Sequence, residues 1–374
     1  RTSDDTAIIF SECECNAAAT YTMNRVKAAP VYVTMEHLEN GVARAIVANS
    51  GNANACAPDG MENARRMAKA AASFLGVEEE DVAVASTGVI GQRINIECIE
   101  EHLPELVLED NASEKANRAI MTTDTKPKTA AVEFTIGGKT CRIGGICKGS
   151  GMIHPNMGTM LSFITTDCAI THEMLTDALQ ENVKKTYNRV TVDGDTSTND
   201  TCFALASGAA APDGPAFTPG TPAFDAFQRA LDQLATTLAR KMAADGEGAT
   251  RLITVTVRGA ATADDADAAA RTVANSPLVK TAVYGHDANW GRVAAALGRS
   301  GARFNQEDVD IDILGLPVCR AGLVVDFDEE EALRRFEEPE VAIEVDLHAG
   351  EESATMWTCD FSHEYVTING DYRS

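Results

Sequence analysis

Short apolar runs alternate with amphipathic helical patterns along most of the chain. Apolar residues recur at helical spacing from Met61 to Leu75, and Gly76 then predicts the end of that helix. Two alternating runs flank Gly137-Gly138, which predicts a β-hairpin over residues 130–146. Other short apolar runs predict strands, at residues 6–10, 43–49, 82–85, 190–192, 253–257, 281–284, 309–314, 341–347 and 356–360.

Further helices are predicted between these strands. Thr171 is typical of an N-cap, and Asn289 is expected to cap a second helix. A long apolar stripe runs through residues 224–242, and residues 264–275 form a helical pattern that ends before a proline. Residues 207–222 are rich in Gly, Ala and Pro and predict a loop or a boundary between lobes. We therefore expect a layered α/β protein, with 374 residues shared between two lobes.

Composition narrows the classes of function. A hydrophobic content of 44% is typical of a globular protein, and no apolar run is long enough to predict a membrane span. The net charge of -24 argues against binding to nucleic acid or to an anionic membrane surface. It also disfavours carboxylate substrates unless local cations reverse the field, and Lys148 and Arg292 are candidates for that role. Such acidity with few lysines is also compatible with life in high salt.

Cysteine and aspartate patterns predict no metal site. The ten cysteines lack ligand-like spacing, so buried reduced thiols are expected; with no signal-peptide pattern, this favours the cytosol. The carboxylates from Asp193 to Asp200 superficially suit calcium. However, the twelfth position counted from Asp193 is Ala204, where an EF-hand loop needs glutamate.

The stretch from Lys148 to Asp167 contains a candidate nucleophile. A glycine-rich turn ends at Gly158, and an apolar run begins at Thr159. A threonine hydroxyl needs a base, and cleavage of the preceding peptide bond would free the backbone amine of Thr159 to serve as one. Gly158 tolerates the strained backbone that an N-to-O acyl shift requires. Taken alone, this local sequence favours an ordinary loop-to-strand junction.

The longer segment from Lys148 to Leu161 resembles the autocleavage segment of the ornithine acetyltransferase family, also called glutamate N-acetyltransferases. The residue before the threonine is usually alanine in the family and is Gly158 here. The resemblance continues in order from Asn24 to the last residue. It implies a layered N-terminal-nucleophile fold, cleaved into an alpha chain, 1–158, and a beta chain, 159–374, that assemble as a heterotetramer of two copies each.

The resemblance also assigns roles in the chemistry. Residues 86–91, Ser-Thr-Gly-Val-Ile-Gly, match the family's oxyanion motif, which gives that role to Thr87 and Gly88. Lys148 would contact substrate and keep the Thr159 amine unprotonated through like-charge repulsion. Read without the resemblance, the dipeptide is a plain turn and Lys148 an exposed lysine.

Three more motifs are expected to bind substrate. In residues 121–127 we favour Thr123, with its neighbouring threonines left open. Glu247, between two glycines, and Asn369 and Ser374, in the C-terminal tail, match further substrate motifs. By themselves these would be a solvated loop carboxylate and a frayed chain end.

The reaction that the resemblance implies is acetyl transfer from N-acetylornithine to glutamate, by a ping-pong mechanism through acetyl-Thr159 and without a cofactor. Use of acetyl-CoA as a second donor stays open. Two alternatives also stay open: a threonine-nucleophile amidohydrolase or aminopeptidase that admits water, and an uncleaved relative without catalytic activity.

Overall fold

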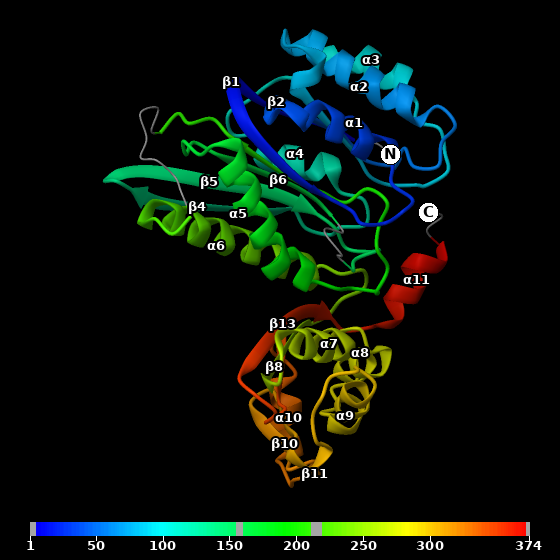
Figure 1. Ribbon diagram of the computed structural model, residues 1–374. Coiled ribbons are helices and arrows are strands. Elements are labelled where there is room, and N and C mark those ends of the chain that lie inside the picture. Colours follow the sequence, from blue (N-terminus) through cyan, green and yellow to red (C-terminus); the bar gives the residue numbers. More distant parts are fainter. Residues whose placement is uncertain (1–4, 155–159, 211–218, 372–374) are drawn as a thin grey trace. The chain divides into compact units, whose positions relative to one another are not determined.

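The computed structural model describes residues 5–154, 160–210 and 219–371. The chain divides into two compact units, each described here by itself (Figure 1). Unit 1 comprises residues 1–188 and 195–238 together with residue 374, and unit 2 comprises residues 189–194 and 239–373. The helix α6 (Pro222–Ala244) contributes residues to both units.

Unit 1 is built on a seven-stranded mixed sheet with the strand order β3-β2-β1-β7-β6-β5-β4. The pairs β2–β3 and β6–β7 are parallel, and the other neighbours are antiparallel. Gly137 and Gly138 both have positive φ, so the predicted hairpin is confirmed. The strands are β1 (Thr6–Tyr21), β2 (Val42–Asn49), β3 (Val82–Ser86), β4 (Lys128–Ile136), β5 (Lys139–Lys148), β6 (Leu161–Thr166) and β7 (Thr201–Ala206).

Helices cover both faces of this sheet. Ala45 and Val47 pack in the cluster that contains α1 and α2, whereas Ile46 and Ala48 face α4 on the opposite side. Figure 1 shows α4 on one side of β4 and β5 and α6 on the other. On the α6 side, the Cys147 thiol lies 3.8 Å from the Leu238 carbonyl oxygen. The helices of unit 1 besides α6 are α1 (Ala29–His37), α2 (Gly60–Leu75), α3 (Ile96–His102), α4 (Ser113–Ile120) and α5 (His172–Lys185).

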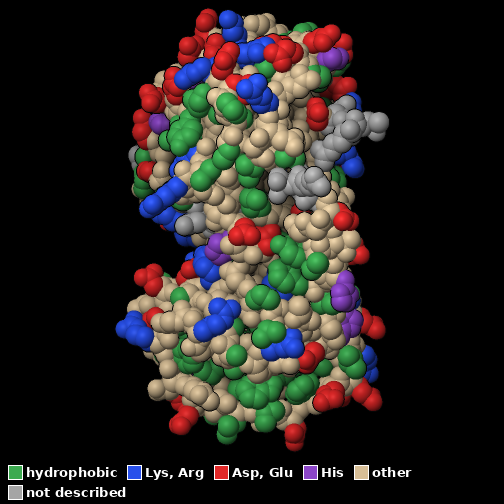
Figure 2. Space-filling model, turned by 90° about the vertical axis from the view of Figure 1, so that its right-hand side faces the viewer, with side chains coloured by type: hydrophobic (Ala, Val, Ile, Leu, Met, Phe, Trp, Pro, Cys, Tyr) green, Lys and Arg blue, Asp and Glu red, His purple; other side chains and the backbone are tan. Residues whose placement is uncertain are grey.

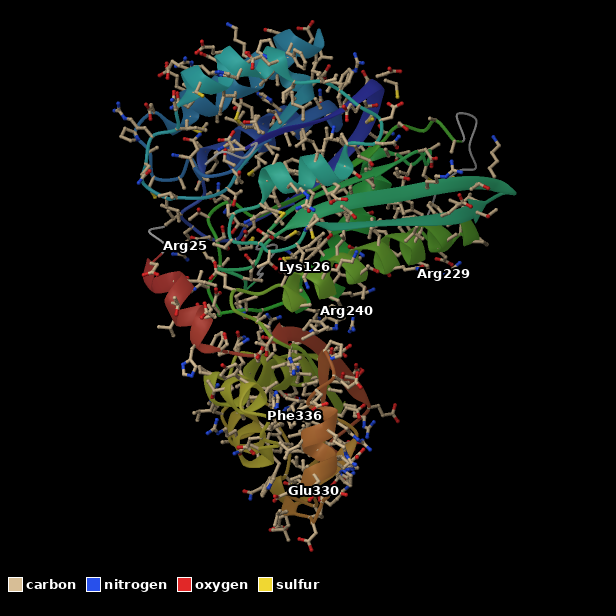
Figure 3. The ribbon with its side chains drawn as sticks, turned by 180° about the vertical axis from the view of Figure 1, so that it is seen from behind. Arg25, Lys126, Arg229, Arg240, Glu330 and Phe336 are labelled. Atoms are coloured by element: carbon tan, nitrogen blue, oxygen red, sulfur yellow. The ribbon has the colours of Figure 1, made fainter. Side chains whose placement is uncertain are left out.

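Unit 2 contains a six-stranded sheet with the order β11-β10-β9-β12-β8-β13. Alternate residues of β8 pack against the buried alanines of α7, and Phe336, labelled in Figure 3, is fully buried in the same core. The strands are β8 (Leu252–Ala260), β9 (Asp310–Ile313), β10 (Leu316–Arg320), β11 (Leu323–Val324), β12 (Glu340–Asp346) and β13 (Glu352–Cys359). The helices are α7 (Ala263–Ala274), α8 (Pro277–Tyr284), α9 (Trp290–Gly298), α10 (Glu329–Arg335) and α11 (His363–Asp371).

Several local predictions are confirmed. The Thr171 and Asn289 side chains accept hydrogen bonds from backbone amides three residues later, as N-caps do. Gly76 closes α2 with φ of +70°. Short 3₁₀ turns connect other elements, at Leu38–Asn40, Glu79–Asp81, Leu103–Glu105, Tyr187–Arg189 and Gln306–Asp308.

Two predictions were wrong. Residues 281–284 belong to the helix α8, because Ser276 caps it and Pro277 occupies its first position. The expected strand at residues 190–192 is reduced to one bridge between Val190 and Trp357. For residues 207–222 the loop alternative agrees with the described positions 207–210 and 219–221, and a boundary between the units falls within α6.

The charged surface side chains and the free cysteines agree with what the sequence predicts. Figure 2 shows acidic side chains interspersed with basic and hydrophobic ones over the face in view. All ten cysteines are free, and seven of them are buried. In the described part of the chain, no helix is long and apolar enough to cross a bilayer.

Candidate active site

Six of the predicted site residues can be located. Thr87, Gly88, Thr123 and Lys148 lie in unit 1, and Glu247 and Asn369 lie in unit 2. The predicted cleavage position, Gly158-Thr159, and the C-terminal Ser374 lie outside the described residues. The nearest described residues to the cleavage position are His154 and Met160.

Lys148 ends β5 and joins two of the predicted motifs. Its ammonium nitrogen lies 2.7 Å from the Thr122 hydroxyl and 3.4 Å from the Thr87 hydroxyl. The side chain is 9% exposed, so the exposed-lysine reading is wrong. In the β5–β6 ladder Lys148 pairs with Leu161, the first residue of β6. The strand that starts two residues after Thr159 therefore lies beside Lys148.

A second buried lysine and an aspartate complete this cluster. The Asp124 carboxylate accepts a hydrogen bond from Lys128 Nζ at 2.6 Å, and its other oxygen lies 3.7 Å from Lys148 Nζ. Burial alone would raise the pKa of Asp124. The charges of Lys148 and Lys128, together with hydrogen bonds from Lys128 and the Gly149 amide, instead hold the pKa of Asp124 well below its ordinary value. Asp124 is therefore ionised between two cations.

Thr87 and Gly88 form a tight turn at the end of β3. Gly88 has φ of +128°, and a Cβ atom built on it would lie 2.3 Å from the carbonyl carbon of Gly51. Only glycine fits there. Because Lys148 donates to the Thr87 hydroxyl oxygen, the hydroxyl proton can point elsewhere. A hydroxyl group and a backbone amide are both types of donor that can form an oxyanion hole.

Asn199 connects this turn to the neighbouring turn that contains Ala53. Its amide group donates to the carbonyl oxygens of Ser86, at 2.8 Å, and Ala53, at 2.6 Å. Asn199 belongs to the acidic segment whose calcium-like pattern was discounted. Within unit 1 Asn199 therefore supports the turn that carries Thr87 and Gly88.

Thr123 and Thr122 have different partners. The Thr123 hydroxyl lies 2.7 Å from the hydroxyl of the buried Ser150. The Thr122 hydroxyl instead accepts a hydrogen bond from the Lys148 ammonium group. Both threonines therefore stay candidates for substrate contact.

Glu247 and Asn369 meet in unit 2. The Asn369 side-chain amide donates to Glu247 Oε2 at 2.7 Å, although 122 residues separate the two. Glu247 is 7% exposed and thus not an ordinary solvated loop carboxylate. The helix α11, which carries Asn369, is an ordered part of unit 2 and not a frayed end over residues 363–371.

Both glycines beside Glu247 are required by close packing. A Cβ atom at Gly246 would lie 2.6 Å from the Cys359 sulfur, and one at Gly248 would lie 2.6 Å from the Tyr365 nitrogen. The buried Asp360 accepts from the backbone amides of Thr250, at 2.8 Å, and Arg251, at 2.9 Å. The loop is thus held against the segment that leads into α11.

Arg292, the other candidate cation, links two helices of unit 2. Arg292 donates to the Leu278 carbonyl at 2.7 Å and to the Thr281 hydroxyl at 3.2 Å, so it fastens α9 to α8. Among the described residues, no cluster of His, Cys, Asp and Glu side chains could hold a metal ion. An open cleft of about 950 Å³ lies over β4, β5 and β6, and none of the six located site residues lines it.

Sequence reasoning missed Asp124, Lys128 and Ser150. Asp124 stands inside the quoted 121–127 motif and Lys128 directly after it, so an acid followed four positions later by a lysine was the available signal. That spacing suggests pairing on a helix, but here both residues flank a turn before β4, near the labelled Lys126 in Figure 3.

Comparison with known proteins places the whole chain in one family. The ArgJ family pattern matches residues 1–374. The arginine biosynthesis bifunctional protein ArgJ of Symbiobacterium thermophilum is 50% identical over 373 residues, which cover 99% of this chain and 92% of that protein. The glutamate N-acetyltransferase of Methanocaldococcus jannaschii is 46% identical over 380 residues, covering 98% and 93%.

A solved structure supports the fold. The crystal structure of the arginine biosynthesis bifunctional protein ArgJ from Bacillus halodurans is 45% identical, with a TM-score of 0.55, and covers 57% of this chain and 100% of that chain. The predicted α/β class, with sheets packed against helices, is confirmed. The chain belongs to the ArgJ family, the glutamate N-acetyltransferases that its motifs resemble.

Proposed function

We propose that this protein transfers the acetyl group of N-acetylornithine to glutamate through an acetyl ester on Thr159. As a member of the ArgJ family it is an acetyltransferase of arginine biosynthesis. The proposal concerns the order of steps and the residues that perform them. It further includes self-cleavage between Gly158 and Thr159, a heterotetramer of two alpha and two beta chains, and a cytosolic location favoured by the buried free thiols.

The first half-reaction forms the ester. The Thr159 hydroxyl oxygen attacks the acetyl carbon of N-acetylornithine, and the free Thr159 amine takes the hydroxyl proton. The Thr87 hydroxyl and the Gly88 amide donate to the oxyanion that forms on the acetyl oxygen. The bond from the acetyl carbon to nitrogen then breaks, and the proton passes from the Thr159 amine to the leaving amine of ornithine.

The second half-reaction repeats these steps with glutamate. Its amine attacks the ester carbon, the same oxyanion donors act again, and the threonine oxygen leaves with a proton. N-acetylglutamate is released, and Thr159 is restored. Whether acetyl-CoA also loads Thr159 can be tested by supplying it in place of N-acetylornithine.

The observation that carries the proposal is the position of Lys148. Its ammonium group touches the Thr87 hydroxyl at 3.4 Å, and its backbone pairs with the first residue of β6. A buried cation there can bind the α-carboxylate of either substrate beside the oxyanion donors. Thr123, Glu247, Asn369 and Ser374 are proposed as further substrate contacts. For Glu247, a carboxylate with 7% exposure suits an ammonium group.

Intact-mass spectrometry tests the proposal directly. The purified protein should show two masses that divide the chain between Gly158 and Thr159. After incubation with N-acetylornithine, the C-terminal piece should gain the mass of one acetyl group and lose it again when glutamate is added. A single species that stays unmodified would overturn the proposal and favour an uncleaved relative. Rapid loss of the acetyl group without glutamate would instead indicate a hydrolase.

The nucleophile can be tested by substitution. Thr159→Ala should give one uncleaved chain and no acetyl transfer, because both steps need the Thr159 hydroxyl. Thr165→Ala, at an exposed position on β6, is the matched control and should cleave and turn over normally. Normal turnover by Thr159→Ala would refute Thr159 as nucleophile.

A further inference from the structure

We infer that Lys128 and Asp124 act through Lys148 as positioning and specificity residues. Asp124 holds the Lys148 side chain in place, and Lys128 compensates Asp124 so that Lys148 offers one net positive charge to a carboxylate substrate. The inference rests on the substrate role proposed for Lys148.

The three charges form a buried chain. Lys128 Nζ lies 2.6 Å from Asp124 Oδ1, and Lys148 Nζ lies 3.7 Å from Asp124 Oδ2. The side chains are 2% exposed for Lys128, 0% for Asp124 and 9% for Lys148. Solvent and salt therefore screen these charges weakly.

Counting charges shows what Lys128 contributes. Asp124 and Lys148 alone would be neutral as a pair, and such a pair would attract a carboxylate little. Lys128 brings the cluster to a net charge of +1. In a chain with a formal charge of -24, which repels anionic substrates, this local surplus decides whether a carboxylate is bound.

Hydrogen bonds hold the cluster rigidly to the chain around Lys148. Asp124 accepts from the backbone amide of Gly149, at 2.7 Å. On the other side, the Asn117 side chain accepts from the Lys128 backbone amide at 2.6 Å and donates to the Cys147 carbonyl at 2.7 Å. The residues before and after Lys148 are thus both fixed to this network, as a preorganised site requires.

The position of the Lys128 ammonium group argues against direct contact with the substrate. It lies against Asp124 Oδ1 and, at 3.4 Å, the Lys126 carbonyl, whereas Lys148 is the lysine that reaches the Thr87 and Thr122 hydroxyls. Lys128 is therefore expected to influence substrate through charge and not through contact.

The test compares two substrates that differ in one charge, N-acetylornithine and its α-carboxamide. The readout is the ratio of their kcat/KM values. Lys128→Met should lower this ratio by about 10- to 100-fold, mainly through KM, because the cluster becomes neutral. Lys128→Arg should restore it. Lys115→Met, at an exposed lysine on α4 in the same unit, is the control for the change in total charge and should leave the ratio unchanged.

A double variant distinguishes charge from structure. Asp124→Asn/Lys128→Met removes both compensating charges and returns the cluster to +1, so its ratio should recover towards wild type. A merely structural role predicts no recovery. If Lys128→Met does not fold, Lys128→Gln replaces it: its side chain is also neutral and should lower the ratio in the same way, and a wild-type ratio in the folded variant would overturn the inference.

The outcomes also separate the two proposals. If Lys148→Met collapses the ratio and folded Lys128→Met keeps it at the wild-type value, only the role of Lys128 is refuted. If Lys148→Met itself keeps the wild-type ratio, Lys148 does not bind the carboxylate, and the substrate role in the proposed function is wrong.

Discussion

Gly88→Ala should damage both the stability of unit 1 and catalysis. The new Cβ atom would lie 2.3 Å from the Gly51 carbonyl carbon and 2.6 Å from the Asn52 nitrogen. Both are backbone atoms, which cannot move away by changing a rotamer. Alanine would in addition have to adopt φ of +128°, a conformation that L-residues rarely take.

The expected cost follows from these two effects. Strained backbone costs about 1–3 kcal/mol, and overpacking costs about 1–3 kcal/mol more. We therefore expect the free energy of unfolding to fall by about 4 kcal/mol, equivalent to a midpoint lower by about 8–16 °C for a domain of this size. Displacing the Gly88 amide should also lower kcat by about 100- to 1,000-fold.

Gly91→Ala is the matched control in the same loop. Gly91 also has positive φ, +81°, but nothing lies within 4 Å of a Cβ atom built there. Only the backbone cost remains, about 1 kcal/mol, which corresponds to about 2–4 °C. Thermal unfolding followed by circular dichroism, with steady-state kinetics on the same samples, measures both variants. Equal losses of stability in the two variants would refute the steric argument.

Two further predictions concern the carboxylates of Glu247 and Asp124. Asn369→Ala should raise the KM for substrate with a stability change below about 1 kcal/mol, because it removes one partly exposed hydrogen bond to Glu247. Asn369→Asp should raise KM further, because it places a second carboxylate beside that of Glu247. Equal KM values for the two variants in steady-state kinetics would contradict this geometry. Because the folded-state pKa of Asp124 lies below its unfolded value of about 3.9, the stability that Asp124 contributes is present above that pH and is lost as the pH falls through the folded pKa. Asp124→Asn should therefore flatten the acid limb of a urea-unfolding series below about pH 4, and an unchanged slope would contradict the assigned ion pairs.

Local patterns predicted most of the regular elements. The α2 helix, the β4–β5 hairpin and the caps at Thr171 and Asn289 follow from residues a few positions apart. The α8 helix was misread because its short apolar run, Pro-Leu-Val-Lys-Thr-Ala-Val-Tyr, carries β-branched residues that suit a strand equally well. In this case the cap at Ser276 was the better guide than the apolar run.

The candidate site depends on contacts that no local pattern contains. Glu247 and Asn369 were each assigned by family motif, but their pairing joins positions 122 residues apart. The charge pairing of Asp124 with Lys128 and Lys148 likewise depends on how β4 and β5 align. Such tertiary contacts are set by packing and register, which sequence spacing does not determine.

The strand order of unit 1 has a consequence for the proposed self-cleavage. Strands β1 to β5 precede Gly158, and β6 and β7 follow it, yet β7 and β6 lie between β1 and β5 in one sheet. The strands β6 and β7 of the C-terminal product would therefore lie within the sheet of the N-terminal product, with β7 hydrogen-bonded to β1 and β6 hydrogen-bonded to β5. Separating them would mean unfolding the middle of the sheet. Dilution should thus not dissociate the pair under native conditions, and the lifetime of the cut enzyme should be set by unfolding of unit 1.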